Sequence, residues 1–266
     1  MSLGAHPYYP PSLELPGYVA PTRGAAALGL TMAAALGLLL AAADAALRRH
    51  RRRLARADRA AALWFVLCGA LHCGFELYYL AHFRTLPATR DVVGEMWKEY
   101  AQSDSRYVAQ SPVVRALETV TVAVVGPLCW AAAYGVWAGR APVRHLAQLA
   151  ASVLHVYSVV LYYGTELLAA RAGRSSCRPE ALYFVGYFVL ANLPWLVVPA
   201  WLAAASAAHI TRCMAAAQRA APARGSDRRL PTGAQRRIAR GGLGGRPPGT
   251  IRARSCSPKQ ESACAE

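Results

Sequence analysis

The sequence predicts an all-α integral membrane protein: a bundle of five transmembrane helices with a lumenal loop and a disordered, basic C-terminal tail. Of its 266 residues, 55% are hydrophobic, and they gather in long blocks instead of the narrow stripes of amphipathic helices. About 20 mainly apolar residues are enough for a helix to cross the hydrocarbon core of a bilayer. Five blocks qualify, at residues 25–47, 61–83, 112–136, 146–170 and 181–208.

The charges predict how these helices cross the membrane. The formal net charge is +16, and the first connection, residues 48–59, carries arginine at positions 48, 49, 51, 52, 53, 56 and 59. Short basic loops remain cytoplasmic, so we expect a lumenal N-terminus and a cytoplasmic C-terminus. The arginines lack the interleaved aromatic residues that are typical of nucleic-acid-binding proteins, so no nucleic acid is expected as a partner.

We divide the chain into an N-terminal lumenal segment (1–24), a transmembrane domain (25–210) and a cytoplasmic basic tail (211–266). The first segment lacks the basic region that opens a secretory signal peptide, so we expect it to remain attached. The tail is rich in Gly, Pro, Ser and Arg and has no hydrophobic periodicity, a composition typical of disorder. Its positive charge favours attraction to an anionic cytoplasmic leaflet.

The first two predicted spans differ sharply in character. Residues 25–47 are almost all Ala, Leu and Gly, which indicates a structural role. Residues 61–83 carry His72 and Glu76 in their middle. Residues four apart share one face of a helix, and ionisable groups inside a membrane are costly enough that function is the default interpretation. We therefore interpret them as a proton-handling pair; the alternative is a structural hydrogen bond between helices.

The connection from 84 to 111 is the longest between the predicted spans. It contains the run WKEYAQSDSRY, from Trp97 to Tyr107, in which aromatic and charged residues are mixed. We expect a lumenal cap, because long ordered loops often carry function. The alternative is a set of interfacial aromatic rings among solvated charges.

The last three predicted spans also carry polar residues. Glu118 and Thr121, three residues apart, share a face of the third span. On the fourth span one side must face inward, and Glu166 lies near its lumenal end, where it can extend toward the interface. The fifth span holds Asn192 and Trp195, with Pro194 expected to bend the helix. The polar residues of the fourth span are His155, Tyr157, Ser158, Tyr162, Tyr163, Thr165 and Glu166.

The depths of these residues in the membrane are compatible with a single site. At a rise of about 1.5 Å per residue, Glu76 and Glu118 lie about 10 Å and about 9 Å from the lumenal ends of their spans. His72, Asn192 and Trp195 lie about 16 to 21 Å from those ends. We therefore expect these side chains to occupy one slab of the bundle.

Six segments together carry a resemblance to a known family. They are HPYYP near the N-terminus, LHCGFELYY, WKEYAQSDSRY, LETVT, GTE at the end of the fourth span, and YFVLANLPWLVVP. In this order and at these spacings, over residues 6–208, the chain resembles the emopamil-binding protein family, the sterol Δ8-Δ7 isomerases of the EXPERA superfamily. The tail is outside the resemblance.

The resemblance implies an enzyme of the endoplasmic reticulum membrane that moves a sterol double bond from the 8(9) to the 7(8) position in cholesterol biosynthesis. The family chemistry protonates carbon 9, passes through a carbocation at carbon 8 and removes a proton from carbon 7, without a cofactor or metal. Its expected partners are a Δ8-sterol, cationic amphiphilic amines that mimic the cation, and membrane lipid. A homodimer, or association with other sterol-synthesis enzymes, is also compatible with the family.

The resemblance also assigns roles to individual residues. His72 and Glu76 match the family's proton donor and acceptor, with their order left open, and Glu118 matches a buried glutamate that places negative charge near the cation. The ring of Trp195 would offer its face to the cation. Further substrate-binding positions are Thr121, Asn192 and Tyr107. In the family a Gly-Asp pair follows the Ile-Tyr of the fourth span, whereas here Ser158 and Val159 follow Tyr157.

Three alternatives stay open at this point. A non-catalytic EXPERA protein would bind sterols or amines without isomerising them. A di-iron hydroxylase or desaturase is disfavoured because the histidines form no clustered pairs, and a proton-coupled transporter because no internal repeat is visible. The seven cysteines are scattered without CxxC spacing, so the sequence supports neither a disulfide framework nor a zinc site.

Overall fold

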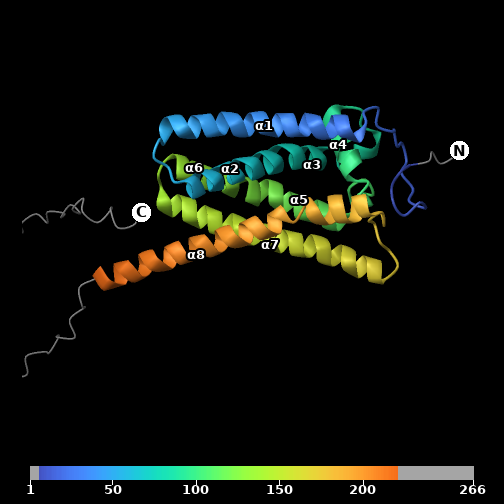
Figure 1. Ribbon diagram of the computed structural model, residues 1–266. Coiled ribbons are helices and arrows are strands. Elements are labelled where there is room, and N and C mark those ends of the chain that lie inside the picture. The colour runs from blue at the N-terminus through green and yellow to red at the C-terminus, as the bar shows by residue number, and fades with distance from the viewer. Residues whose placement is uncertain (1–5, 221–266) are drawn as a thin grey trace, which may run out of the picture. The chain divides into compact units, whose positions relative to one another are not determined.

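The computed structural model describes residues 6–220, which form helices and turns and contain no strand (Figure 1). The contacts divide the chain into two units, residues 1–209 and residues 210–266. The described part of the second unit, 210–220, is the last stretch of a helix. Most of the predicted disordered tail lies outside the described residues.

The first unit contains the five predicted spans. The first is α1 (Ala25–His50); the second joins α2 (Arg56–Ala70) to α3 (Leu77–Ala81); the third joins α5 (Pro112–Val120) to α6 (Gly126–Trp137). The fourth is α7 (Ala141–Arg171), and the fifth ends in α8 (Pro194–Ala220). All five are long and apolar enough to cross a membrane, so the predicted multi-pass bundle is confirmed. The fourth span begins earlier than predicted, and the fifth helix continues beyond residue 208.

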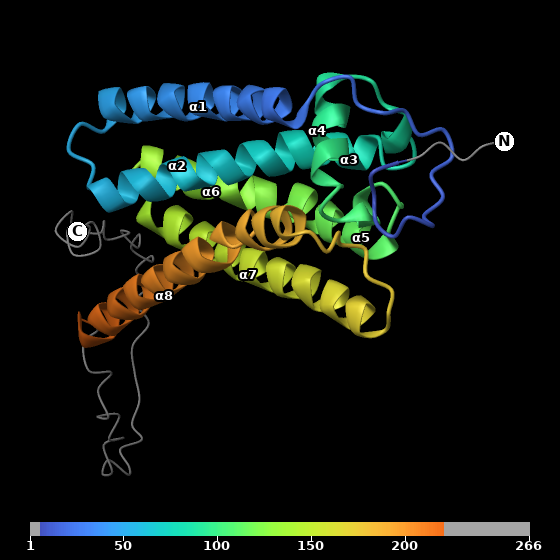
Figure 2. The same ribbon diagram turned by 45° about the vertical axis from the view of Figure 1, so that its right-hand side comes forward.

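Figures 1 and 2 show how the helices of the first unit pack side by side. Helix α1 lies at one edge and contacts α2, α2 packs on α6, and α6 packs on α7. Phe65, Cys68, Cys129, Ala132 and Ala151 are fully buried in this contact layer. Small side chains let neighbouring helices approach closely inside a membrane, where van der Waals packing holds a bundle together.

Three of the spans contain π-helical segments, which the sequence analysis did not predict. They are Leu71–Glu76 in the second span, Thr121–Val125 in the third and Leu182–Leu190 in the fifth. Such wider turns are rare and concentrate at functional sites. Pro194 begins α8 directly after the third of these segments and a turn, so the predicted irregularity at Pro194 is a break between two helical segments.

The two π-helical turns of the second and third spans meet at Gly126. A Cβ atom at this position would lie 2.5 Å from the Cys73 Sγ atom and 3.2 Å from the His72 Cβ atom. No ordinary side chain fits such a space without moving its neighbours. Glycine at this position therefore sets the close approach of the two spans.

The connection between the second and third spans forms a folded cap. It contains α4 (Val92–Tyr100), whose N-terminus is capped by the Asp91 carboxylate, and a short turn at Ser105–Tyr107. Four charged side chains of this cap are buried: Glu95, Lys98, Asp104 and Arg106. The segment folds into a cap, as predicted, and its lumenal side stays a prediction. The alternative of solvated charges is wrong, because these charges have partners within the fold.

Glu95 ties the N-terminal segment to the cap. Its carboxylate accepts hydrogen bonds from the backbone and hydroxyl of Thr22, at 2.9 Å each, and from the backbone and guanidinium of Arg23, at 3.2 and 3.0 Å. Burial acts to raise the pKa of Glu95, but these donors outweigh it and lower the pKa to about 2. Lys98 is buried beside it and donates to the carbonyls of Val19 and Thr89.

A second buried charge cluster fastens the cap to α7. Arg106 pairs with Asp104 at 2.6 Å and lies 3.6 Å from Glu166. Glu166 also accepts hydrogen bonds from Ser175 and from the backbone of Ser176. Glu166 is only 2% exposed, so the expectation that it extends toward the interface is wrong: its charge is matched inside the protein.

We expect the docking of the N-terminal segment to weaken in acid through Glu95. Because its pKa falls from 4.5 to about 2 on folding, its stabilising contribution is complete above pH 4.5 and is lost as the pH falls toward 2. Hydrogen-exchange protection of the Thr22 and Arg23 amides at several pH values measures this docking. In Glu95→Gln, the protection of these amides should be lower at pH 7 and should change less between pH 5 and pH 3. Glu14 is exposed, so Glu14→Gln should behave like wild type. An unchanged pH profile in Glu95→Gln would contradict the assignment.

Candidate active site

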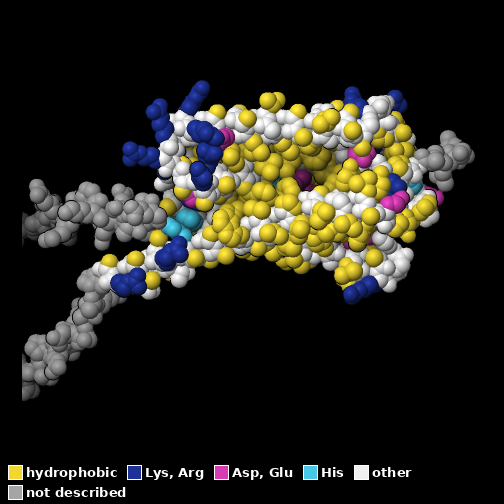
Figure 3. All heavy atoms as spheres, in the orientation of Figure 1, with side chains coloured by type: hydrophobic (Ala, Val, Ile, Leu, Met, Phe, Trp, Pro, Cys, Tyr) yellow, Lys and Arg dark blue, Asp and Glu magenta, His cyan; other side chains and the backbone are white. Residues whose placement is uncertain are grey.

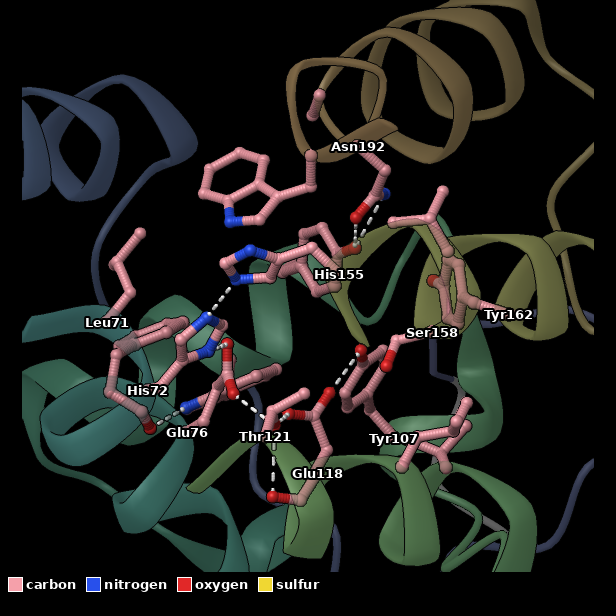
Figure 4. Close-up of a pocket in the computed structure, with 18 residues that line it drawn as sticks. Leu71, His72, Glu76, Tyr107, Glu118, Thr121, His155, Ser158, Tyr162 and Asn192 are labelled. Carbon is pink, nitrogen blue, oxygen red and sulfur yellow. Dashed lines mark hydrogen bonds and ion pairs between the residues drawn. The ribbon is translucent and has the colours of Figure 1, made fainter. Parts of the chain in front are cut away.

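A cavity of about 280 Å³ lies inside the bundle beneath the cap. Its lining comes from four of the five spans and from the cap (Figure 4). The structure brings together every residue that the sequence analysis selected: His72, Glu76, Tyr107, Glu118, Thr121, Asn192 and Trp195. The prediction that these separate segments form one site is therefore supported by geometry.

His72 and Glu76 form the pair expected from their spacing. The His72 Nδ1 atom lies 2.7 Å from the Glu76 Oε1 atom. Both residues belong to the π-helical turn Leu71–Glu76, and His72 is buried. The pair can hold a proton between an imidazole nitrogen and a carboxylate oxygen.

Thr121 joins this pair to the second carboxyl group. Its hydroxyl donates to the Glu76 Oε2 atom at 2.6 Å and lies 3.3 Å from the Glu118 Oε2 atom. The Tyr107 hydroxyl donates to the Glu118 Oε1 atom at 2.8 Å. His72, Glu76, Thr121, Glu118 and Tyr107 therefore form a continuous hydrogen-bonded chain along one wall of the cavity, visible in Figure 4.

The cap holds Tyr107 in this chain. Burial, and then the nearby Glu118 carboxylate, raise the pKa of Tyr107 well above its usual range, so its hydroxyl keeps its proton and acts as a donor. Its neighbour Arg106 donates to the Thr165 hydroxyl at 2.8 Å and to the Tyr162 carbonyl at 3.2 Å. The cap is thereby anchored on α7, and Tyr107 is anchored with it.

Aromatic rings form much of the remaining lining. The Trp97 ring stacks on Phe75, with centroids 4.4 Å apart, and packs against Tyr100 and Tyr107. The Asn192 amide donates to the Tyr100 hydroxyl at 3.0 Å and to the Phe188 carbonyl at 2.9 Å, which fixes the break in the fifth span against the cap. Ring faces attract cations, by about 0.5 to 2 kcal/mol each.

One wall comes from the fourth span, whose inward face the sequence analysis expected but to whose residues it gave no role in the site. His155, Ser158, Val159 and Tyr162 of α7 line the cavity, and the His155 Nε2 atom lies 2.8 Å from the His72 Nε2 atom. These four positions follow the spacing i, i+3, i+4, i+7 of one helix face, a signal that was present in the sequence. Val159 stands where the family pattern has an acid, and the polar group here lies one turn earlier, at His155.

The outer surface of the bundle suits a lipid environment. Figure 3 shows one face covered by hydrophobic side chains, with an acidic side chain visible inside a recess of that face. Lys and Arg side chains gather toward the ends of the bundle in this view. Apolar molecules dissolved in a membrane therefore have a surface on which they can approach the interior.

Comparison with known proteins identifies relatives of this chain. The family model of EBP, described as EXPERA (EXPanded EBP superfamily), matches residues 92–206. The mouse 3-beta-hydroxysteroid-Delta(8),Delta(7)-isomerase is 33% identical over 159 residues, covering 59% of this chain and 67% of the mouse protein. A probable 3-beta-hydroxysteroid-Delta(8),Delta(7)-isomerase of Oryza sativa subsp. japonica is 31% identical over 199 residues, covering 74% and 89%. Protoglabretal synthase MOI1 of Citrus sinensis is 31% identical over 150 residues, covering 56% and 69%.

We expect Tyr107→Phe to destabilise the protein through Glu118. The substitution removes a donor from a buried carboxyl group while preserving the ring, and a buried group left without its partner costs about 1 to 3 kcal/mol. Unfolding of the purified protein in detergent measures the change. The matched control is Tyr157→Phe on α7, because Tyr157 is exposed on the outside of the bundle. Equal stability of the two variants would show that the Tyr107 hydroxyl does not support Glu118.

Proposed function

Because this chain belongs to the EXPERA family, the expanded EBP superfamily, we propose that it is a sterol Δ8-Δ7 isomerase of a membrane. The observation that carries the proposal is the hydrogen-bonded chain from His72 to Tyr107 along a cavity inside an apolar bundle. Moving a double bond requires a proton donor, a proton acceptor and an environment that tolerates a cation. The cavity contains candidates for the donor and the acceptor, and its aromatic rings and carboxyl groups suit a cation.

The proposed reaction adds one proton to the sterol and removes another. A proton from the chain adds to carbon 9, and the electron pair of the 8(9) double bond forms the new carbon–hydrogen bond. Carbon 8 is left with a positive charge. A base of the chain then takes a proton from carbon 7, and that carbon–hydrogen pair becomes the 7(8) double bond. No electrons are gained or lost overall, so the reaction requires no redox partner.

His72 and Glu76 are the proposed donor and acceptor, in an order that the geometry leaves open. Whichever group gives the first proton, the charge of the chain falls by one as the charge of the sterol rises by one. Thr121 links both carboxyl groups, so the negative charge left behind can be shared by Glu76 and Glu118. This pairing of charges lowers the energy of the cation because the cavity lies inside an apolar bundle, where bulk water does not screen the attraction.

Aromatic rings supply the second source of cation stabilisation. Trp195 lines the cavity and packs against Trp64 with ring centroids 5.4 Å apart. Trp97 and Tyr100 line the cavity from the cap. The cationic carbon carries no N–H or O–H group that could donate a hydrogen bond, so ring faces suit it better than lone-pair donors, which could add to carbon 8. Amphipathic amines that carry a permanent positive charge would mimic this intermediate and compete for the cavity.

We also propose the endoplasmic reticulum as the location, with the N-terminal segment and the cap on the lumenal side. The support is the basic connection between α1 and α2, whose arginines favour the cytoplasmic side. A homodimer, and association with other sterol-synthesis enzymes, remain predictions from the family.

Two other functions found among EXPERA proteins are alternatives to the isomerase. A relative named protoglabretal synthase matches this chain nearly as well as the isomerases do, which favours testing the substrate of that synthase beside sterols. A non-catalytic EXPERA protein would bind the same ligands without turning them over. The continuous proton chain favours catalysis, because binding alone does not require a donor and an acceptor in contact.

We expect membranes containing this chain to convert a Δ8-sterol to its Δ7 isomer. Because positioned acid–base groups contribute about 10²- to 10⁴-fold to a rate, Glu76→Gln and His72→Ala should lower turnover by about that factor. Glu180→Gln, an exposed carboxyl outside the cavity, is the control. Sterol analysis of isomerase-deficient cells expressing each variant provides the measurement.

Two results would contradict this assignment. If both variants kept full turnover, the acid–base roles would be wrong even though the isomerase activity stood. If the wild-type chain bound amines tightly but left the Δ8-sterol level of the cells unchanged, the non-catalytic alternative would replace the isomerase.

A further inference from the structure

Next to the proton chain, two cysteines and two histidines from three helical spans converge. We propose that Cys68, His72 and His155, completed by Cys129, bind a thiophilic divalent cation such as Zn²⁺, and that the bound cation blocks the site. The inhibition rests on the proposed function; the binding of the cation does not. The cysteines and His155 have no part in the isomerase mechanism derived above.

The ligand atoms are close enough for one cation. The Cys68 thiol and the imidazoles of His72 and His155 each offer an atom within 4.8 Å of the other two, and all three residues are buried. Zinc bonds nitrogen at about 2.0 Å and sulfur at about 2.3 Å, so tetrahedral ligand atoms lie about 3.3 to 3.8 Å from one another. Side-chain shifts of about 1 Å or less would therefore bring the three atoms to bonding distance.

His72 has the hydrogen-bond partner that a metal-binding histidine usually has, a carboxylate. Its Nε2 atom faces the cluster, while its Nδ1 atom lies 2.7 Å from the Glu76 carboxylate. A ligating histidine normally donates its other N–H group to a carboxylate or carbonyl, which fixes the ring and makes the bonding nitrogen more basic. Figure 4 shows His72 between Glu76 and His155 in this arrangement.

His155 also lacks a competing role within the protein. Its Nδ1 atom is buried without a hydrogen-bond partner among the described residues, and its Nε2 atom lies 2.8 Å from the Nε2 atom of His72. Two imidazole nitrogens in contact can share one proton. A cation between them would replace that single hydrogen bond by two metal–nitrogen bonds.

Charge balance explains why Cys129 belongs to the site. Cys129 is fully buried in the same packed layer as Cys68, and its thiol interacts with both Cys68 and His155. When Zn²⁺ binds two thiols and two neutral imidazoles, the thiols release two protons and the complete site has no net charge. An uncharged site is the arrangement that costs least inside a membrane-spanning bundle. Two cysteines and two histidines are also a common ligand set for zinc.

Occupation of this site would inhibit the isomerase. The cation would hold the Nε2 lone pair of His72 permanently, so the imidazole could no longer exchange a proton through that atom. We therefore expect turnover to fall by about the 10²- to 10⁴-fold that a positioned acid–base group contributes.

The test uses Cd²⁺ with the full-length protein in lipid nanodiscs and a phosphine reductant. Cadmium bound to thiolates absorbs in the ultraviolet, so the titration reports thiolate coordination without reference to activity. We expect one strongly bound Cd²⁺ per chain, with the absorption lost in Cys68→Ser and Cys129→Ser and retained in Cys213→Ser. Glu76→Gln, which removes the partner of His72 but no ligand, should weaken the apparent affinity by about 10- to 100-fold.

Each outcome has a distinct consequence. Absence of thiolate absorption at saturating Cd²⁺, or equal absorption in Cys68→Ser, Cys129→Ser and wild type, would overturn the site. Inhibition is measured as turnover with Cd²⁺ relative to turnover of the same variant with chelator. Binding without inhibition would overturn the blocking role. Normal cadmium binding by a chain that isomerises no sterol would support the metal site and overturn the proposed function.

Discussion

The structure depends on one constraint: a charged or hydrogen-bonding side chain inside a membrane-spanning bundle must find its partner within the protein. Water is not available there to satisfy it, and an unpaired group costs several kcal/mol. His72, Glu76, Thr121, Glu118 and Tyr107 meet this constraint together, each bonded to the next. The same contacts that make these groups tolerable also make them a path for protons, so stability and chemistry have a common origin.

The cap obeys the same rule at the end of the bundle. Glu95 is matched by Thr22 and Arg23, and Arg106 is matched by Asp104 and Glu166. These bonds join the N-terminal segment, the cap and α7 into one body around Tyr107. Tyr107, which donates to Glu118, is therefore positioned by charged residues that do not line the cavity.

The sequence was sufficient for the parts of the fold that depend on local pattern. Block length gave the five spans, helical spacing placed His72 beside Glu76 and Glu118 beside Thr121, and the rise per residue put them at a common depth. Contacts between residues far apart in the sequence could not be predicted. No local pattern indicates that Glu95 binds Thr22, and Glu166 resembles an interfacial residue because it lies near the end of a span. His155 is an intermediate case, because the spacing of His155, Ser158, Val159 and Tyr162 marks one inward face, but no rule says which of several polar residues meets His72. The π-helical turns were unpredictable for a different reason, since a spacing of four residues suits both helix types.

Those wide turns bear on how the chain can change during evolution. In an ordinary helix each residue advances the rotation by about 100°, and a π-helical turn accommodates an extra residue without extending the regular helix on either side. Deleting one residue between Leu71 and Glu76 would restore regular winding but rotate one half of the span relative to the other, turning either Phe65 or Tyr79 out of the packed interior. Length changes should therefore be selected against at these turns, so that the number of residues in each of these spans is inherited as strictly as their identity.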